Sequence, residues 1–366
     1  MNKKVCHITS AHSRNDIRIF LKECISLAKN YYDVILIVND SEPDEVNKGV
    51  KIISTKFKPR NRLDRFLNSK KLLLAKAIEV DADIYHLHDP DLLPLGNRLK
   101  SMGKKVIFDS HEDIPKQIID KVWIPKIFRR FISNVYSLYE KNSLKKYDAV
   151  ITVTPHIVER LLKINPNTVM ITNYPIVDLD SNVNRKPNNS ICFAGGVCSQ
   201  YNHEKIIKAI EKIENIEYIL AGDGSKEYLS LLQSLPAWGK VNYLGKVPYK
   251  EVKNIYINSI AGLALDYSSQ GKEQGTLGVI KIFEYMEAGI PVICSNYKLW
   301  KEIIEGNNCG ICVDPHNIED ITKAIKYILN NPEKAKKMGE NGRKAVIEKY
   351  NWGTQERILI DLYERL

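Results

Sequence analysis

The sequence lacks several features that would assign it to a specialised class of protein. No apolar run reaches the length of about 18 residues that a transmembrane helix needs. The first residues, MNKKVCHITS, lead straight into a strand pattern and not into a signal peptide. Internal repeats, low-complexity tracts and heptad arrays are also absent, which excludes solenoids and coiled coils. We therefore expect a soluble, cytoplasmic protein of ordinary globular type.

Cysteine is scarce and shows no pattern of pairing. Among the 7 cysteines, Cys6, Cys192, Cys294 and Cys312 lie within apolar strand-like runs, as reduced core residues do. Cys309 and Cys312 form a CxxC pair, but no second pair and no histidine at zinc spacing accompanies it. We attribute this pair to chance and predict no metal site.

Two further absences narrow the function. No strand is followed by a GxGxxG motif with an acidic residue about 20 positions on, which argues against a nicotinamide-dependent oxidoreductase. The cations are scattered and not gathered on one motif, which argues against a nucleic-acid binder. The net charge of +10 still predicts an anionic partner, for which an acidic membrane surface and a nucleoside diphosphate both qualify.

The length and the apolar pattern predict two domains. A chain of 366 residues exceeds what one hydrophobic core usually supports. Apolar, β-rich runs alternate with helix-period segments in both halves, which predicts parallel sheets covered by helices on both faces. The polar, turn-rich stretch 176–190 separates the halves. We predict an α/β protein with two Rossmann-like domains, residues 1–175 and 191–351, that face each other across a cleft.

The stretch 271–294 carries the most informative pattern. Three glycines, Gly271, Gly275 and Gly278, punctuate a polar loop, and a helix-period segment then runs until Gly289. Backbone N–H groups of such a loop and the positive end of the helix suit a phosphate. Lys281 and Glu284 share one helix face, where a cation can meet phosphate and a carboxylate can accept from two sugar hydroxyls. An amphipathic helix with a solvent ion pair would show the same spacing.

The residues of this stretch decide between the two interpretations. The pattern KxFEYMxxGxPV resembles the donor-binding signature of glycosyltransferase family 4, enzymes of the GT-B fold; it comprises Lys281, Phe283, Glu284, Tyr285, Met286, Gly289, Pro291 and Val292. The resemblance covers nearly the whole chain, and it implies that a closing helix, 352–366, crosses back to the first domain.

The resemblance implies the activity of a retaining, metal-independent glycosyltransferase. Such an enzyme moves a hexose-type sugar from a nucleoside-diphosphate sugar, and a UDP-sugar is favoured as the donor. The acceptor would be a glycan or a lipid-linked glycan in bacterial cell-envelope polysaccharide synthesis, and no cofactor is expected. The alternative is a degenerate transferase that binds a nucleotide sugar or a partner enzyme without turnover.

Polar clusters follow the strands of the first domain, where open α/β sheets place their ligands. The loop and helix start at 10–24 resembles the family's HxxxDxRIxxKE opening, which shapes the acceptor side, although a solvated loop would look similar. Its candidate residues are His12, Arg14, Asp16 and Arg18. In IYHLHDPDLLPLG, His86 and His88 point the same way on a strand. We place His88 at the acceptor-side edge of the cleft and His86 in the core.

The strand KVIFDSHEDIP, 105–115, ends in a dense group of ionisable residues that is rarely just structural. By resemblance, His111 matches the histidine that family members hold against the donor sugar near the reacting centre. Glu112 lies beside it and is assigned to orienting the acceptor. The resemblance implies a front-side displacement in which the departing phosphate helps take the acceptor proton, so we assign no nucleophile.

The predicted donor site combines Lys281 for the diphosphate and Glu284 for the ribose with turns after the strands of the second domain. These turns contribute Gly195, Gly196, Gly222, Gly245, Lys246, Thr276 and Gly278. Two departures from the family pattern stand out. Gly196 and Tyr201 occupy the places of an Arg and a Lys that usually hold the diphosphate, so its charge falls on backbone N–H groups, Lys281 and Lys272. Thr276 replaces a Glu that contacts the donor sugar.

The segment 116–146 mixes apolar residues with cations. Such a face suits docking on anionic lipid, whereas an ordinary core helix with a basic solvent face is at least as compatible with the pattern. Many family members act on lipid-linked acceptors, so peripheral association with the inner face of the plasma membrane is a hypothesis for this segment.

Overall fold

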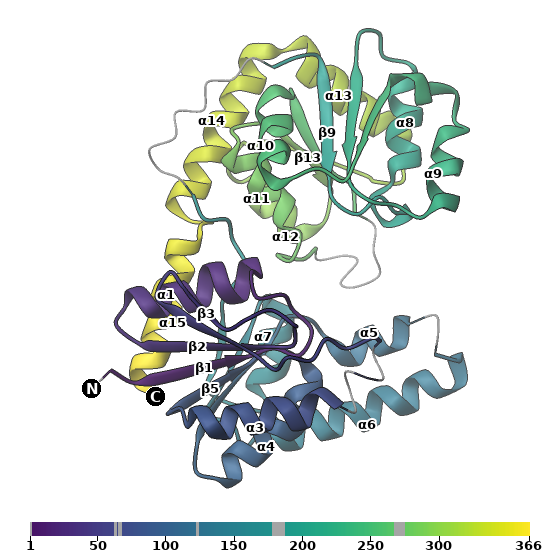
Figure 1. Ribbon diagram of the computed structural model, residues 1–366. Coiled ribbons are helices and arrows are strands. Elements are labelled where there is room, and N and C mark those ends of the chain that lie inside the picture. The colour runs from purple at the N-terminus through teal and green to yellow at the C-terminus, as the bar shows by residue number, and fades with distance from the viewer. Residues whose placement is uncertain (1, 62–63, 65–67, 122–123, 178–186, 267–274) are drawn as a thin grey trace. The chain divides into compact units, whose positions relative to one another are not determined.

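The computed structural model describes residues 2–61, 64, 68–121, 124–177, 187–266 and 275–366. The chain divides into two compact units (Figure 1). One comprises Met1–Asn173 with Trp352–Leu366, and the other comprises Tyr174–Asn351. Within the predicted linker 176–190, residues 178–186 lie outside the described part of the chain.

The first unit is built on a sheet with the strand order β3-β4-β2-β1-β5-β6-β7-β8. The neighbouring strands run parallel except for β3 and β4. Their bounds are β1 Lys4–Ile8, β2 Asp33–Val38, β3 Glu45–Asn47, β4 Val50–Ser54, β5 Ile84–Leu87, β6 Lys105–Ser110, β7 Ala149–Thr152 and β8 Thr168–Met170.

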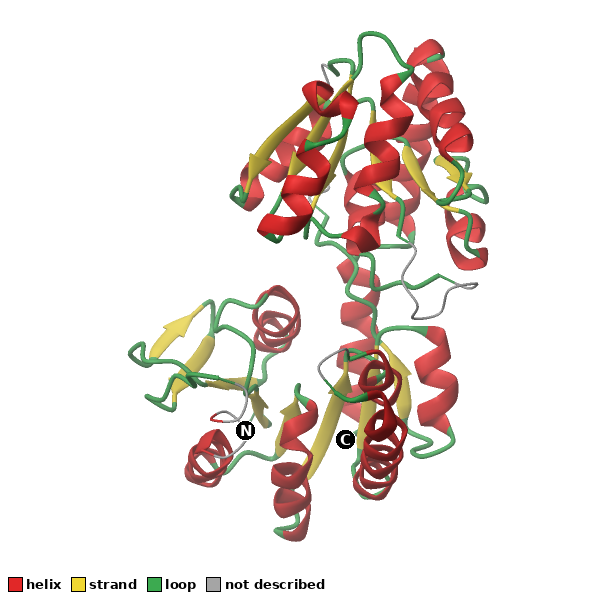
Figure 2. Cartoon of the chain, turned by 90° about the vertical axis from the view of Figure 1, so that its right-hand side faces the viewer, coloured by secondary structure: helices red, strands yellow, loops and turns green. Residues whose placement is uncertain are grey.

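Helices lie on both faces of this sheet, as Figures 1 and 2 show. They are the π-helix Ile17–Cys24, α1 Ile25–Lys29, α3 Lys70–Val80, α4 Leu93–Ser101, α5 Ile114–Asp120, α6 Lys126–Leu144, α7 Pro155–Leu162 and α15 Trp352–Arg365. α5 and α6 extend beyond the edge of the sheet (Figure 1). α15 packs on the first unit, where the Trp352 indole donates to Ser26 Oγ at 2.9 Å and the Gln355 side-chain oxygen accepts from the Thr172 N–H at 2.8 Å.

The second unit contains a parallel sheet with the order β11-β10-β9-β12-β13-β14. Its strands are β9 Ser190–Ala194, β10 Glu217–Ala221, β11 Val241–Gly245, β12 Ala261–Ala264, β13 Val292–Ser295 and β14 Gly310–Val313. Its helices are α8 His203–Glu211, α9 Lys226–Gln233, α10 Tyr249–Asn258, α11 Ile280–Glu287, α12 Lys298–Ile304, α13 Ile318–Asn330 and α14 Pro332–Glu348.

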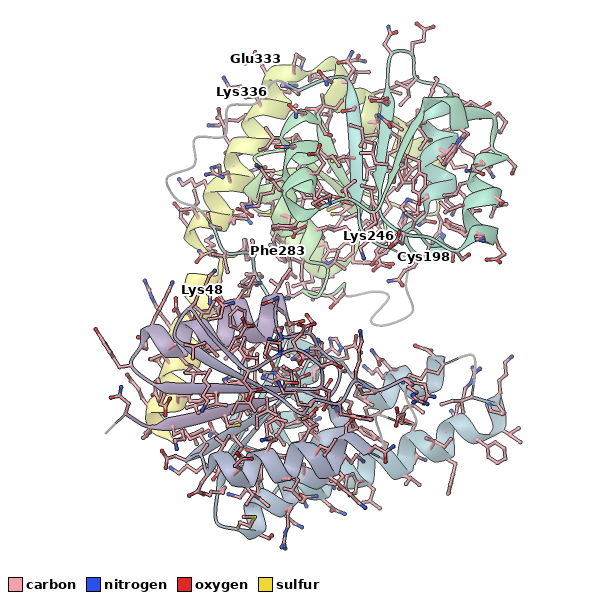
Figure 3. All side chains as sticks on the ribbon, in the orientation of Figure 1. Lys48, Cys198, Lys246, Phe283, Glu333 and Lys336 are labelled. Atoms are coloured by element: carbon pink, nitrogen blue, oxygen red, sulfur yellow. The ribbon has the colours of Figure 1, made fainter. Side chains whose placement is uncertain are left out.

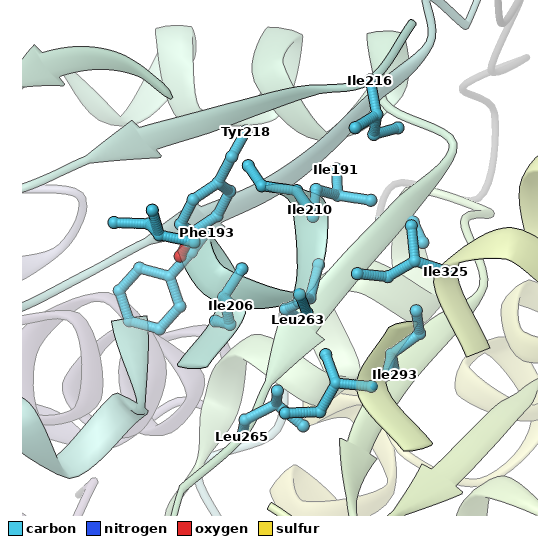
Figure 4. Close-up of a cluster of buried hydrophobic side chains, with 14 of the residues drawn as sticks. Ile191, Phe193, Ile206, Ile210, Ile216, Tyr218, Leu263, Leu265, Ile293 and Ile325 are labelled. Carbon is cyan, nitrogen blue, oxygen red and sulfur yellow. The ribbon is translucent and has the colours of Figure 1, made fainter. Parts of the chain in front are cut away.

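Strands buried on both faces explain the near-continuous apolar runs of the sequence. In the second unit, Ile191 and Phe193 of β9 pack against Ile206 and Ile210 of α8, and Ile325 of α13 belongs to the same cluster (Figure 4). The predicted α/β fold with two Rossmann-like sheets is confirmed. None of the helices in the described ranges combines the length and apolar character needed to cross a bilayer.

Candidate functional site

Glu284 lies on α11 between two tyrosine hydroxyls. Tyr249 donates to its Oε1 at 3.4 Å, and Tyr256 donates to its Oε2 at 3.3 Å. As predicted, α11 ends just before Gly289, which adopts φ +68°. Both tyrosines come from α10, so two helices fix the direction of this carboxylate. Glu284 is half-buried, and a carboxylate has more acceptor sites than these two hydrogen bonds use.

The Lys281 ammonium rests on two aromatic rings. Its Nζ lies 4.1 Å from the ring centroid of Tyr201 and 4.6 Å from that of Phe193. Burial lowers the Lys281 pKa, although Glu284 and Asp266 act in the opposite direction. Tyr201 stands where the family pattern has a Lys, and its ring contacts the ammonium of Lys281.

Backbone loops after β9, β10 and β11 join at one edge of the second sheet. Gly195 N–H donates to Ala221 O at 3.0 Å, and Gly222 N–H donates to Gly245 O at 2.7 Å. Gly222 has φ +136°, and a Cβ there would lie 1.7 Å from Gly195 O, so a side chain cannot fit. A Cβ at Gly195 would lie 3.4 Å from Lys281 Nζ, which places the ammonium beside this glycine backbone.

Two other predicted donor residues surround these loops. Lys246 directly follows β11 and is exposed at the same end of the sheet as Cys198 (Figure 3). Gly196 has open space beside it: a Cβ there would meet no described atom within 4 Å. The structure therefore brings Gly195, Gly222 and Lys281 together and leaves room at Gly196.

Thr276 belongs to a short tethered segment before α11. Its Oγ1 accepts from the Gly278 N–H at 3.1 Å, and its carbonyl accepts from the Trp300 indole N–H at 2.9 Å. Trp300, which sequence reasoning did not single out, thus fixes the backbone at Thr276. The predicted Gly271 and Lys272 lie outside the described residues.

In the first unit, His111 follows β6 and is paired with Asp109. The distance from His111 Nε2 to Asp109 Oδ2 is 2.9 Å. Arg18 donates to the same carboxylate from Nε at 2.8 Å and from Nη2 at 3.0 Å. Burial would raise the Asp109 pKa, but Arg18 and the neighbouring histidines hold it well below the usual value. An ionised Asp109 therefore fixes the His111 ring, while Arg18 is buried and occupied by this ion pair.

Among the other residues predicted for the acceptor side, His12 lies near His111, whereas Arg14 and Glu112 contact other residues. His12 Nδ1 lies 3.1 Å from Asp16 Oδ2, and the His12 ring lies 5.5 Å from the His111 ring. The hydrogen bond with Asp16 is the main cause of the raised His12 pKa. Arg14 turns away and donates to Asp40 at 2.8 and 2.9 Å. Glu112 is exposed, and the Gln117 side-chain amide donates to it.

His88, which we predict to lie at the acceptor-side edge of the cleft, is a buried residue of the first unit. It is fully buried beneath Asp109, with Nδ1 3.6 Å from Asp109 Oδ2. His86 is also buried and contacts the Tyr363 hydroxyl at 2.8 Å from Nδ1. Burial is the main cause that lowers the pKa of both imidazoles, and it raises the pKa of neighbouring Glu23 well above its usual value. The predicted core position of His86 agrees with its burial.

Solved structures with the same fold cover the whole chain. Sucrose-phosphate synthase from Thermosynechococcus elongatus matches with a TM-score of 0.76 and 17% identity, covering 100% of this chain and 99% of that chain. Anabaena HepE in complex with UDP matches with a TM-score of 0.71 and 12% identity, covering 100% of both chains.

Two family models match consecutive parts of the sequence. Residues 21–181 match the model described as Glycosyltransferase Family 4, and residues 178–345 match the model described as Glycosyl transferases group 1. The chain belongs to the GT-B glycosyltransferases. Its predicted resemblance to glycosyltransferase family 4 is confirmed.

This glycosyltransferase also has curated relatives. An uncharacterised glycosyltransferase of Methanocaldococcus jannaschii is 29% identical over 180 residues, and the match spans 48% of this chain and 44% of that relative. A second one from the same organism is 27% identical over 288 residues, spanning 74% of this chain and 78% of the relative. A GDP-mannose-dependent phosphatidylinositol monomannoside mannosyltransferase of Mycobacterium tuberculosis is 30% identical over 91 residues, spanning 25% and 23%.

Proposed function

We propose that this protein is a retaining glycosyltransferase that moves a hexose-type sugar from a UDP-sugar to a glycan or lipid-linked acceptor in polysaccharide synthesis. The observation that carries the proposal is the pairing of Glu284 and Lys281 on one face of α11. The carboxylate is directed by two tyrosine hydroxyls, and the ammonium is held beside the Gly195 backbone. This face matches the two polar ends of a nucleoside diphosphate.

Glu284 is assigned to the ribose and Lys281 to the diphosphate. A carboxylate can accept from both ribose hydroxyls, and charge-assisted hydrogen bonds of this kind are stronger than neutral ones. The diphosphate is assigned to the backbone at Gly196, beside which there is open space, together with the Lys281 ammonium, because the Arg and Lys of related enzymes are replaced here. UDP is favoured as the nucleotide, which agrees with the UDP complex of Anabaena HepE.

For the transfer we assign a front-side displacement mechanism that uses neither a metal ion nor a cofactor. The bond between the sugar C1 and the phosphate oxygen breaks, and the acceptor oxygen bonds to C1 on the same face. The acceptor proton passes to the departing phosphate, so the protein supplies no nucleophile. His111 donates to the donor sugar or stabilises charge at the reacting carbon, and Asp109 sets the orientation of its ring.

We assign a lipid-linked glycan at the inner face of the plasma membrane as the acceptor, because α6 exposes its apolar side. Ile127 and Phe131 are 80% and 67% exposed, whereas the buried side of the same helix includes Ser133 and the ion-paired Glu140. In an ordinary core helix the apolar residues are buried and the polar residues are exposed. The cations Lys126, Arg130, Lys141 and Lys145 on or beside it favour an anionic surface.

A product assay tests the activity. The purified chain is incubated with UDP-sugars, with and without lipid-linked glycan acceptors, and UDP release is followed together with the anomeric configuration of the product. Slow hydrolysis without acceptor and faster release with acceptor are expected. Tight UDP-sugar binding with neither hydrolysis nor transfer would favour the second candidate, a degenerate transferase that only binds, which the missing Arg and Lys support.

A further inference from the structure

Four side chains of types that can bind a metal meet beneath Asp109, next to the Asp109–His111 pair. His7 on β1 lies in register with His86 on β5. His88 follows His86 by two positions and therefore points to the same side of the sheet. Glu23 reaches them from the π-helix Ile17–Cys24. All four side chains are fully buried, so this group is a core feature and not a solvated surface cluster.

The distances within the group do not describe a hydrogen-bonded carboxylate. Each residue offers one ligand atom, and these atoms all lie within 4.8 Å of one another. Glu23 Oε2 lies 4.0 Å from His7 Nδ1 and 3.9 Å from both His86 Nδ1 and His88 Nε2. These separations exceed hydrogen-bond length, and Oε2 has no hydrogen-bond partner among the described residues. A buried carboxylate oxygen left unsatisfied is unfavourable. The imidazoles contact one another and Tyr363: His7 Nδ1 lies 2.9 Å from His88 Nε2, and His86 Nδ1 lies 2.8 Å from the Tyr363 hydroxyl. The four ligand atoms are close enough together for one cation to replace these contacts and to satisfy the carboxylate oxygen.

Arg18 and Asp109 lie near the remaining polar atoms of Glu23 and His88. Glu23 Oε1 lies 3.1 Å from Arg18 Nε, and the other His88 nitrogen, Nδ1, lies 3.6 Å from Asp109 Oδ2. Carboxylates facing the second nitrogen of an imidazole are typical of metal-bound histidines. Arg18 contacts both Glu23 and Asp109 and so links the group to the carboxylate above it.

We propose that His7, His86, His88 and Glu23 form a structural site for a divalent transition-metal ion of the Zn²⁺ class. Imidazole and carboxylate ligands suit this class, and the absence of a thiolate from the set disfavours Cu(I). Four protein ligands around a buried ion leave no position for substrate, as in structural zinc sites. The ion would join β1, β5 and the π-helix beneath the Asp109–His111 pair, and the sugar transfer would still need no metal.

Metal analysis of the full-length chain tests the proposal without an activity assay. We expect close to one Zn²⁺ per chain by mass spectrometry, lost on unfolding with a chelator and regained on refolding with Zn²⁺. A Co²⁺-loaded sample should show visible absorption of a nitrogen- and oxygen-ligated site. Occupancy should fall at least tenfold in Glu23→Gln. The matched control is His203→Gln, which changes a buried histidine of the other unit and should keep full occupancy.

The wild-type chain alone can overturn the proposal, so the test does not depend on the variants folding. Fewer than about 0.1 equivalents of metal, both after purification and after refolding with Zn²⁺, Co²⁺ or Mn²⁺, would exclude the site. Equal occupancy in Glu23→Gln and the wild type would remove Glu23 from it. Neither result depends on nucleotide binding, so a failure here is distinct from a failure of the proposed transfer activity.

Discussion

His111 Nε2 lies 2.9 Å from Oδ2 of Asp109, and Arg18 donates to both oxygens of the same carboxylate. The ionised carboxylate accepts from the imidazole, so the ring is fixed before any substrate arrives and its other nitrogen is left for the ligand. Preorganised groups of this kind contribute most where charge develops in the transition state.

His111→Ala should therefore lower turnover about 100-fold while nucleotide affinity stays nearly native. Single-turnover kinetics and calorimetry with UDP measure the two effects separately. His156→Ala, which removes a half-buried histidine of the same unit, is the control and should leave turnover close to native. Near-native turnover of His111→Ala would overturn our placement of the reacting centre.

Lys281 should carry an unusually large part of the diphosphate binding energy. Lys281→Ala is expected to weaken UDP binding by about 2 kcal/mol, because a charged hydrogen-bond donor is lost, and to change uridine binding little. Lys246→Ala, an exposed lysine at the same end of the sheet, should cost much less. Calorimetry with UDP and uridine gives both values. Equal losses for the two ligands would show that Lys281 does not contact phosphate.

Glu284→Gln keeps one acceptor oxygen but loses the negative charge. Nucleotide affinity should fall by about 1 to 3 kcal/mol if both ribose hydroxyls donate to this carboxylate. Glu251→Gln, an exposed residue of neighbouring α10, is the matched control and should bind UDP like the wild type. Comparison of UDP with 2′-deoxy-UDP adds a second test, since the variant should discriminate between them less than the wild type. Unchanged UDP affinity would rule out the ribose assignment.

The helix of the proposed donor side could be predicted because its signals are local. The spacing of Lys281 and Glu284 and the position of Gly289 indicate a helix, its end and the face that carries both side chains within ten residues of sequence. Trp300 could not be found this way, because its indole fixes Thr276 across 24 positions. The role of the Tyr201 ring likewise depends on its contact with Lys281, which no sequence spacing shows.

The first unit was harder to predict because its contacts join distant strands. Arg18 and Asp109 are 91 positions apart, so the sequence could place each after a strand or in a helix start but could not pair them. The contact between His88 and Asp109 likewise joins two strands and has no local sequence signal. In α6, the sequence showed apolar and basic residues correctly, but only the packing reveals that the apolar ones face outward.

His203 should make the stability of the second unit depend on pH. Its ring is buried against Tyr218, and burial, followed by the charge of Lys281, lowers its pKa from 6.5 to about 3. The unfolded chain therefore binds the extra proton between these values, and this contribution to stability is complete above pH 6.5 and is lost as pH falls toward 3.

Denaturant unfolding of the wild type and His203→Gln between pH 4 and 8 measures the effect. The difference in unfolding free energy should shrink toward acidic pH by up to about 1.4 kcal/mol per pH unit. The same measurement on His316→Gln, an exposed histidine of this unit, should show no comparable slope. A pH-independent difference for His203→Gln would mean that this histidine does not carry the proton linkage.

The exposed apolar side of α6 gives the last prediction. If it docks on anionic lipid, the double variant Ile127→Ser, Phe131→Ser should lose binding to vesicles containing phosphatidylglycerol. It should keep its thermal stability, because both side chains are mostly exposed in the free protein. Arg130→Gln should weaken binding by about 1 kcal/mol and reduce its dependence on salt. Arg129 is left intact, since its guanidinium donates to Ile124 O at 2.7 Å and supports the start of the helix. Leu231→Ser removes an exposed leucine of the second unit and serves as the control. Vesicle binding that is absent in the wild type, or equal in the double variant and the control, would mean that the apolar side of α6 serves something other than a membrane.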